Sequence, residues 1–467
     1  MRLSFQYIIT GLYFCTCLAA VPACKKQDAW LNVKNNKSSV VPETLADFQA
    51  IMDNSNPFND SYTQEGLMGS DDFYLPDAEF QAAGETERNL YIWNKTIWPG
   101  DGGSSLWTNL YKIVEYSNVV LDGLGKQSLD HQSSEYLNIK GQALFHRALA
   151  NYTLAQIFCK EYSKNSGSDL GLPMRLNSDV NEIVQRSSLD KTYLQIISDL
   201  NEAKSFLPDT QPFLQRPVRA AAHLLMAKTL LHMEDYAAAG GLAAEAIERR
   251  PTLLDYNDPS KVSLASEYRF NTLGSGNPEV LFYAESFAFR EVRPSTSSPG
   301  VVSPELYNLY DENDLRKTLL YAEENGAIKF RGSFSGNYTG FCGLTGGELY
   351  LIAAECQARL GNTAVALNLL NTLLVNRYKS GRFTPLTGTD QEKTLVIILG
   401  ERRKELAFSA NNRWEDLRRL NKDVRFSKVL KRSLNGLTYQ LPAGDQRYIL
   451  PIPLNEINLS GIEQNER

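Results

Sequence analysis

The stretch VRAAAHLLMAKTLLHMEDYAAAGGLAAEAIERRP, residues 218–251, gives the clearest indication of the fold. Its apolar residues recur at steps of three and four, which predicts a pair of helices over residues 218–233 and 236–250. Small side chains stand where two packed helices come closest to each other, at Ala227, Ala239 and Ala246. Pro251 follows directly and cannot continue the second helix. This stretch therefore predicts two helices packed against each other.

The same spacing is typical of tetratricopeptide (TPR) repeats, which have small residues at positions 8, 20 and 27 and a proline at position 32. A later pair of predicted helices covers residues 348–360 and 364–378. Ala354 and Ala366 in this pair have the same separation as Ala227 and Ala239. Ala203 and Pro208 have the same separation as Ala246 and Pro251. General packing of alanine-rich helices is the alternative, and three partial matches favour degenerate TPR units.

Further helical periodicity appears on both sides of these pairs. It covers residues 107–121, 139–157, 193–203, 391–409 and 412–420, with a short helical patch at 44–52. Residues 66–104 have no clear period and are expected to form loops.

Residues 252–347 also lose the helical period and are rich in aromatic residues. Short strand-like runs such as 280–284 are separated there by glycine and proline clusters, and a long insertion of this kind usually carries a functional surface. We expect a mainly α fold, a TPR-like scaffold with a loop-rich aromatic face. It would be one domain, 24–467, with a helical half at about 40–251, an insert at 252–347 and a C-terminal unit at 348–467.

The N-terminus has the order of a secretory signal. Arg2 supplies a positive charge, residues 7–23 carry no charge, and small residues precede Cys24. The apolar part is too short for a membrane span. Val21-Pro22-Ala23-Cys24 is similar to a bacterial lipobox. We therefore expect residues 1–23 to be removed and Cys24 to be lipidated, which anchors the protein to a membrane that it does not cross.

Composition excludes several classes of function. Removal of residues 1–23 takes away one positive charge, so the net charge of −6 becomes −7, which disfavours a nucleic-acid-binding protein. The cysteines after Cys24 form no C-x-x-C motif, and the four histidines have no zinc-ligand spacing. We expect no metal and no cofactor. Cys356 is predicted to be a buried thiol, and whether any cysteines pair is left open.

Several motifs near the C-terminus occur in a specific order. They are Glu348-Leu349-x-Leu351-Ile352-Ala353-Ala354-Glu355, Glu401-Arg402-Arg403-Lys404-Glu405-Leu406-Ala407-Phe408, Arg413-Trp414-x-Asp416-Leu417-Arg418-Arg419 and Leu450-Pro451-Ile452-Pro453. With the earlier Trp107-x-x-Leu110-Tyr111, they make nearly the whole mature sequence resemble the SusD/RagB family of outer-membrane nutrient-binding lipoproteins. The resemblance implies a helical TPR scaffold with a loop-rich ligand face.

The resemblance also implies a function. Members of this family lie on the outer face of the outer membrane, bind glycans or other oligomers, and pass them to a SusC-like TonB-dependent transporter. We therefore expect a non-catalytic, lipid-anchored binding protein. A secreted glycoside hydrolase and a TPR scaffold for outer-membrane protein assembly are the alternatives. The ligand and the transporter partner are not identified by the sequence.

Loop aromatics are the candidate ligand-binding residues, because sugar rings stack on aromatic faces. Trp93 and Trp98 lie outside any helical period beside a glycine-rich turn, and Tyr74 and Phe287 come second. For each of them, packing against the domain surface is the alternative. Trp107 and Trp414 lie on helical faces and are expected in the core.

Two groups of charged residues invite a catalytic interpretation. Asp71 and Asp72 could form the acid and base pair of a glycosidase, but hydrogen bonding to sugar hydroxyls or loop capping is favoured. The charged helix at 401–405 could form an active site with Arg413. For this helix we favour a structural ion-pair network that holds the C-terminal helices together.

Overall fold

The computed structural model describes residues 42–100, 102–164, 166–287 and 289–467. The predicted signal peptide and Cys24 lie outside these described residues. Within them, no helix has both the length and the apolar character that a bilayer span requires. Residues 45–467 form one compact unit.

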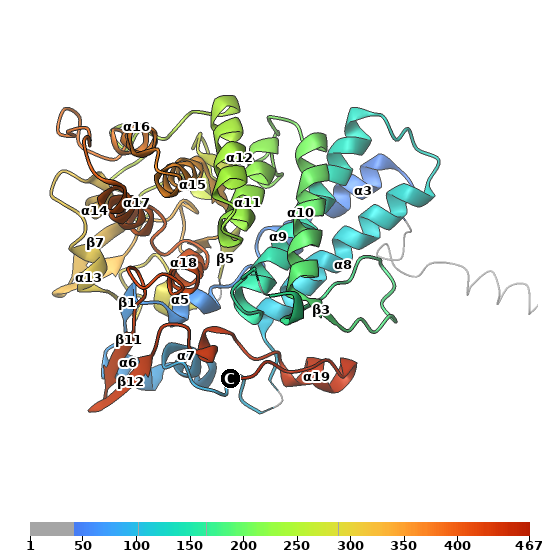
Figure 1. Ribbon diagram of the computed structural model, residues 1–467, viewed down its shortest axis with the longest axis horizontal. Helices are drawn as coiled ribbons and strands as arrows, with labels where there is room; N and C mark the ends of the chain where they lie inside the picture. Colours follow the sequence, from blue (N-terminus) through green and yellow to red (C-terminus); the bar gives the residue numbers. More distant parts are fainter. Residues whose placement is uncertain (1–41, 101, 165, 288) are drawn as a thin grey trace, which may run out of the picture. The chain divides into compact units, whose positions relative to one another are not determined.

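Long helices form the scaffold of this unit. They are α3 (Leu45–Met52), α8 (Ser105–Lys126), α9 (Ser134–Phe158), α10 (Leu189–Phe206), α11 (Arg219–His232), α12 (Tyr236–Arg249), α15 (Gly346–Arg359), α16 (Thr363–Leu374), α17 (Gln391–Glu405) and α18 (Asn412–Leu420). From α8 to α12 each helix packs against the next, and α12 packs against α15, which contacts both α16 and α17. Figure 1 shows this succession, from α8 in cyan to α16 in brown.

The small residues lie at the helix contacts that the repeat spacing predicts. Ala227 of α11 and Ala239 and Ala246 of α12 are fully buried, as are Ala354 of α15 and Ala366 of α16, and α11 packs against α12 as α15 packs against α16. Gly240 of α12 faces α15 so closely that a Cβ atom there would lie 3.1 Å from Cβ of Cys356. The prediction of a mainly α, TPR-like scaffold is confirmed.

Short helices occupy part of the region that was expected to consist of loops. Residues 66–104 contain most of α5 (Glu65–Gly69) together with α6 (Asp77–Ala82) and α7 (Glu85–Tyr91), so that expectation was wrong. Helices of five to seven residues make at most two turns, which is too short for a repeating apolar pattern. Other short helices are α4 (Ser55–Phe58), α13 (Pro304–Tyr307), α14 (Leu315–Leu320) and α19 (Leu454–Ser460).

The described strands pair as six antiparallel two-stranded ribbons. They are β1 (Phe73–Tyr74) with β6 (Val301–Val302), β2 (Leu170–Pro173) with β3 (Arg186–Ser188), β4 (Val280–Phe282) with β10 (Leu344–Thr345), β5 (Glu285–Ser286) with β9 (Gly340–Phe341), β7 (Tyr321–Glu324) with β8 (Ala327–Phe330), and β11 (Leu430–Leu434) with β12 (Leu437–Leu441). Strands β4 to β10 all lie in the insert. β4 confirms the strand-like run that begins at residue 280.

The last turns of α17 contain five consecutive charged residues, 401–405, and each of them forms an ion pair. We call this segment the α17 hub. On one side, Glu401 and Glu405 accept hydrogen bonds from Arg316 of α14 at 2.6 and 3.0 Å. Glu405 also pairs with Arg377 at 2.7 Å, and this arginine binds the buried Glu279.

On the other side of the hub, Arg402 pairs with Glu348 of α15 at 3.1 Å and with Asp416 of α18 at 2.9 Å. Arg419 of α18 extends the network to Glu355 of α15, with two N···O distances of 2.6 and 2.8 Å. These pairs connect three helices through buried charges. They confirm the prediction of a structural ion-pair network in this segment.

Other predictions about the core also hold. Trp107 and Trp414 are both buried. Cys159, Cys342 and Cys356 are buried and unpaired, which confirms the predicted thiol at Cys356. Burial raises the pKa of the Cys356 thiol to about 12, so this cysteine is uncharged at neutral pH.

The pair between Arg419 and Glu355 provides a test of the network. Burial opposes ionisation of Glu355, but Arg419 and Arg359 outweigh it and lower the pKa from 4.5 to about 2. Arg419→Gln leaves this buried carboxylate with one fewer partner and is expected to reduce the free energy of unfolding at pH 7 by about 3–5 kcal/mol. Glu355 contributes its full stabilisation above about pH 4.5 and loses it as the pH falls toward 2. The cost of the substitution should therefore shrink between pH 7 and about pH 3, as measured by urea denaturation.

Arg425→Gln is the matched control, because Arg425 also binds an aspartate, Asp423, but on the protein surface. This variant should leave the free energy of unfolding unchanged within error. Equal effects of the two substitutions would contradict a stabilising role for the buried network.

Candidate functional site

Trp93 and Trp98, the first-choice ligand residues, lie in the core. Their side chains are only 2% and 5% exposed. Trp93 Nε1 donates a hydrogen bond to the carbonyl of Gly69 at 2.8 Å, and Trp98 Nε1 donates to that of Pro451 at 3.0 Å. With so little of either side chain exposed, the placement of both tryptophans does not support the expectation that they stack on a ligand. They resemble loop residues in sequence because the helices around them are short.

Asp71 and Asp72 are held by cations from the C-terminal helices. Both oxygens of Asp71 accept from Arg413, at 2.7 and 2.9 Å, and Asp72 accepts from Arg403 at 3.0 Å. Burial opposes ionisation of Asp71, but Arg413 and Arg403 outweigh it and hold the pKa well below its usual range. A carboxylate fixed in this way serves as a tether between β1 and α17–α18, which disfavours the interpretation as a glycosidase acid and base pair.

Tyr74 and Phe287, the second choices, are exposed by 44% and 52%. Tyr74 ends β1, and Phe287 directly follows β5 in the insert. Both side chains are therefore accessible to a ligand.

Another exposed aromatic residue, Tyr338, lies beside Phe287. In the ribbon of β5 and β9, Ser286 pairs with Gly340. Residue 287, which follows β5, and residues 338–339, which precede β9, therefore lie at the same end of the ribbon. The rings of Phe287 and Tyr338 meet edge to face with centroids 5.4 Å apart. The guanidinium of Arg293 lies 4.1 Å from the centre of the Phe287 ring.

The turn that carries Tyr338 is held by buried hydrogen bonds. Ser335 Oγ donates to the carbonyl of Thr339 at 2.6 Å, and Thr339 Oγ1 donates to Glu285 Oε2 at 2.7 Å. The same oxygen of Glu285 accepts from Tyr283 Oη at 2.5 Å. Tyr338 is thus an exposed ring on a backbone that is already ordered, which lowers the entropic cost of binding.

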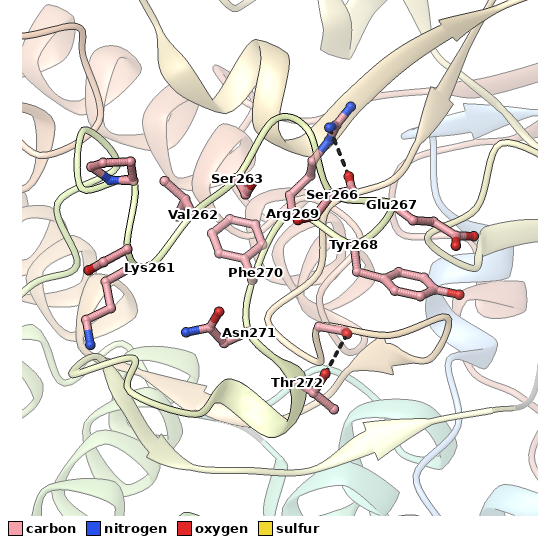
Figure 2. Close-up of a pocket in the computed structure, with 13 residues that line it drawn as sticks. Lys261, Val262, Ser263, Ser266, Glu267, Tyr268, Arg269, Phe270, Asn271 and Thr272 are labelled. Carbon is pink, nitrogen blue, oxygen red and sulfur yellow. Dashed lines mark hydrogen bonds between the residues drawn. The ribbon is translucent and has the colours of Figure 1, made fainter.

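A polar pocket of about 300 Å³ lies next to this turn and is lined by residues 259–263, 266–272 and Gly336 (Figure 2). We call it the insert pocket. Lys261, Tyr268 and Asn271 offer an ammonium, a phenol and an amide there. Burial raises the pKa of Tyr268, and the charges of Glu267 and Tyr338 raise it further. We call the insert pocket together with Phe287 and Tyr338 the insert face.

Another pocket, of about 340 Å³, brings together three of the predicted residues, Asp71, Tyr74 and Trp93. Residues 428–433, from β11 and the segment before it, form another part of its lining, and we call it the β11 pocket. Arg432 of β11 lies in it and was missed at the sequence level. The signal for its hairpin was available, since Asn435-Gly436 between alternating residues favours a tight β-turn, and both residues have positive φ angles of 50° and 77°.

A groove of about 700 Å³ lies along α8, with Trp107 and Tyr111 in its lining together with part of α19. Its edges carry the exposed aliphatic residues Val180, Ile183 and Leu459. None of the predicted ligand residues lies there. Among the described residues, no cluster of His, Cys, Asp or Glu has the arrangement of a metal site.

Comparisons with known proteins agree on one family. A family model described as "Starch-binding associating with outer membrane" matches residues 29–231, and one described as "SusD family" matches residues 346–466. The SusD-like protein P2 of Formosa agariphila is 24% identical over 437 residues, which cover 81% of this chain and 83% of that protein.

Solved structures have the same fold. A putative sugar binding protein from Bacteroides vulgatus has a TM-score of 0.72 at 22% identity, and the match covers 91% of this chain and 99% of that chain. A SusD superfamily protein from Bacteroides thetaiotaomicron has the same TM-score and identity, with 91% and 100% covered.

Substitution of Gly336 tests whether its close contact with Asn271 orders the insert face. Its φ of +64° favours glycine, and a Cβ atom would lie 2.3 Å from the backbone of Asn271. Gly388 has the same φ of +64° but open space around it. Gly388→Ala should reduce the free energy of unfolding by about 1–2 kcal/mol through backbone strain alone. Gly336→Ala should cost at least about 1 kcal/mol more, because the backbone must shift, and should speed amide hydrogen exchange at residues 335–339. Equal costs, with unchanged exchange, would show that this contact does not order the insert face.

Proposed function

Because the chain belongs to the SusD/RagB family, we propose that it binds a glycan at the insert face and delivers it to a SusC-like TonB-dependent transporter. The observation that carries this proposal is the exposed pair of Phe287 and Tyr338 beside a polar pocket. Sugar rings have apolar C–H faces that pack on such aromatic rings, while their hydroxyls need hydrogen-bonding partners. The insert face supplies both kinds of contact within one segment of the chain.

The arrangement favours binding over catalysis. The two aspartates that suggested a glycosidase form ion pairs with Arg403 and Arg413, which supports a structural role for them. At the insert face, Glu285 accepts hydrogen bonds from Tyr283 and Thr339 and thereby orders the turn of Tyr338. Affinity would come from stacking and hydrogen bonds, with no bond broken in the glycan.

The aromatic pair gives the first test of this function. Purified residues 25–467 are run by affinity electrophoresis through gels that contain a panel of polysaccharides. One polymer should retard the wild type, and Phe287→Ala or Tyr338→Ala should weaken binding about three- to tenfold, because each removes a stacking surface.

Phe213→Ala is the matched control. Phe213 is also exposed and also has an arginine near its ring, Arg216 at 5.5 Å, but it is not part of the insert pocket. Its substitution should leave mobility unchanged. Retardation that survives loss of both Phe287 and Tyr338 would place glycan binding elsewhere, and cleavage of the polymer would favour the glycoside hydrolase.

We also propose that the protein is held in the outer membrane by acyl chains on Cys24, with its binding face toward the cell exterior. Cys24→Ser removes the acceptor of the lipid, so the protein should move from the membrane fraction to the soluble fraction after cell lysis. Cys17→Ser changes a cysteine within the predicted signal peptide and should leave the protein in the membrane fraction. Membrane retention of the Cys24 variant would contradict lipid anchoring at this residue. Co-purification of a SusC-like transporter with the membrane form would support the proposed partner.

A further inference from the structure

Arg432 occupies a core position of a β-strand. In β11, Leu430, Arg432 and Leu434 face inward and are buried, whereas Lys431 and Ser433 face outward. The alternation of a strand calls for an apolar residue at the middle inward position. The arginine there is only 8% exposed. A buried cation costs free energy unless it is compensated, so its presence requires an explanation.

The contacts of Arg432 compensate its charge only in part. Its guanidinium lies 3.4 Å from the centre of the Tyr91 ring and 4.8 Å from that of Trp93. Nη2 donates to the carbonyls of Met68 and Ser70. Nη1 is buried and has no hydrogen-bond partner among the described residues. The aromatic rings therefore lie beside the guanidinium, and Nη1 is left without a partner.

Nη1 of the buried Arg402 and Arg418 also lacks a hydrogen-bond partner, but these two arginines form ion pairs with carboxylates. Arg316, Arg377 and Arg419 each bind at least two carboxylate side chains at 3.0 Å or less. Within the part of the chain that the structure describes, Arg432 forms no ion pair. Burial lowers its pKa to about 10, so it keeps its proton at neutral pH.

The β11 pocket around Arg432 has an excess of positive charge. Its lining includes two carboxylates, Asp71 and Glu305, and three cations, Lys428, Lys431 and Arg432. Both carboxylates are already neutralised, since Asp71 binds Arg413 and Lys428, and Glu305 binds Lys428 and Arg403. An anion that enters this pocket would therefore find a cation that has no other anionic partner.

We propose that the β11 pocket binds an oxyanion group, a carboxylate or a sulfate, carried by a saccharide. Arg432 would bind the group through its free N–H, and Tyr74 at the exposed rim would contact the sugar. Guanidinium is the side-chain group best suited to planar oxyanions. The choice of a saccharide as carrier rests on the proposed glycan binding, and the pocket assigns that glycan to an acidic or sulfated class.

The test compares charged and neutral forms of the same sugar chain by isothermal titration calorimetry. Oligogalacturonate is compared with its methyl-esterified form, κ-carrageenan oligosaccharide with its desulfated form, and sodium sulfate is titrated alone. At least one charged form should bind at least about tenfold more tightly than its neutral counterpart, and Arg432→Gln should abolish this difference.

A second variant keeps the inference testable if Arg432→Gln does not fold. Tyr74→Glu places a negative charge at an exposed position of the pocket and should weaken binding of the charged form about tenfold, with little effect on the neutral form. Phe213→Glu adds the same charge at an exposed position that is not in the pocket lining and should change neither affinity.

The outcomes separate this inference from the proposed function. Equal affinity for charged and neutral forms, no binding of any probe, or an undiminished charge preference in Arg432→Gln or Tyr74→Glu would overturn the assignment of the pocket. Sulfate alone binding as tightly as the charged oligosaccharides would overturn the saccharide as carrier. Persistent binding of a charged glycan after loss of Phe287 and Tyr338 would support the pocket while it refutes glycan binding at the insert face.

Discussion

The α17 hub, the five charged residues at 401–405, joins segments that are far apart in the sequence. Because successive residues of a helix point in different directions, one helical turn and a half reaches several partners at once. Arg402 reaches α15 and α18, Arg403 reaches Asp72 before β1, and Glu405 reaches Arg316 and Arg377. Replacing such buried pairs with apolar residues can be neutral, but removing one partner leaves a charge without compensation. The network therefore fixes which segments meet, whatever its net contribution to stability.

The hub also holds residues that lie next to the proposed β11 pocket. Arg403 holds Asp72 and Glu305, whose neighbours Tyr74 and Ser303 line the β11 pocket. On the insert side, Glu405 and Glu401 bind Arg316 of α14. The helical scaffold contributes few side chains to either proposed surface.

The sequence predicted the scaffold better than the surfaces. Ala227, Ala239 and Ala246 revealed the repeat because helix contacts impose a period that is visible along the chain. The ion-pair network was predictable from the charge of residues 401–405. The burial of Trp93 and Trp98 was not visible in the sequence because a region of short helices and loops leaves no period, and their hydrogen bonds to Gly69 and Pro451 involve distant backbone. Tyr338 and Arg432 were missed since their roles depend on strand pairing and on an unmet hydrogen bond, which only coordinates show.

The position of Phe287 and Tyr338 at the end of the β5–β9 ribbon means that ligand specificity can change while the fold stays the same. Only two residue pairs define its register, and Phe287 and Tyr338 project from its end, about fifty positions apart in sequence. Residues beyond the ribbon can change in length and identity while the alanine contacts of the helices stay the same. A lineage could therefore acquire a new nutrient by changing the residues that flank β5 and β9, and proteins of this fold should diverge fastest there. For the same reason, exchange of the residues that flank β5 and β9 between relatives offers a route to redesign specificity on an unaltered scaffold.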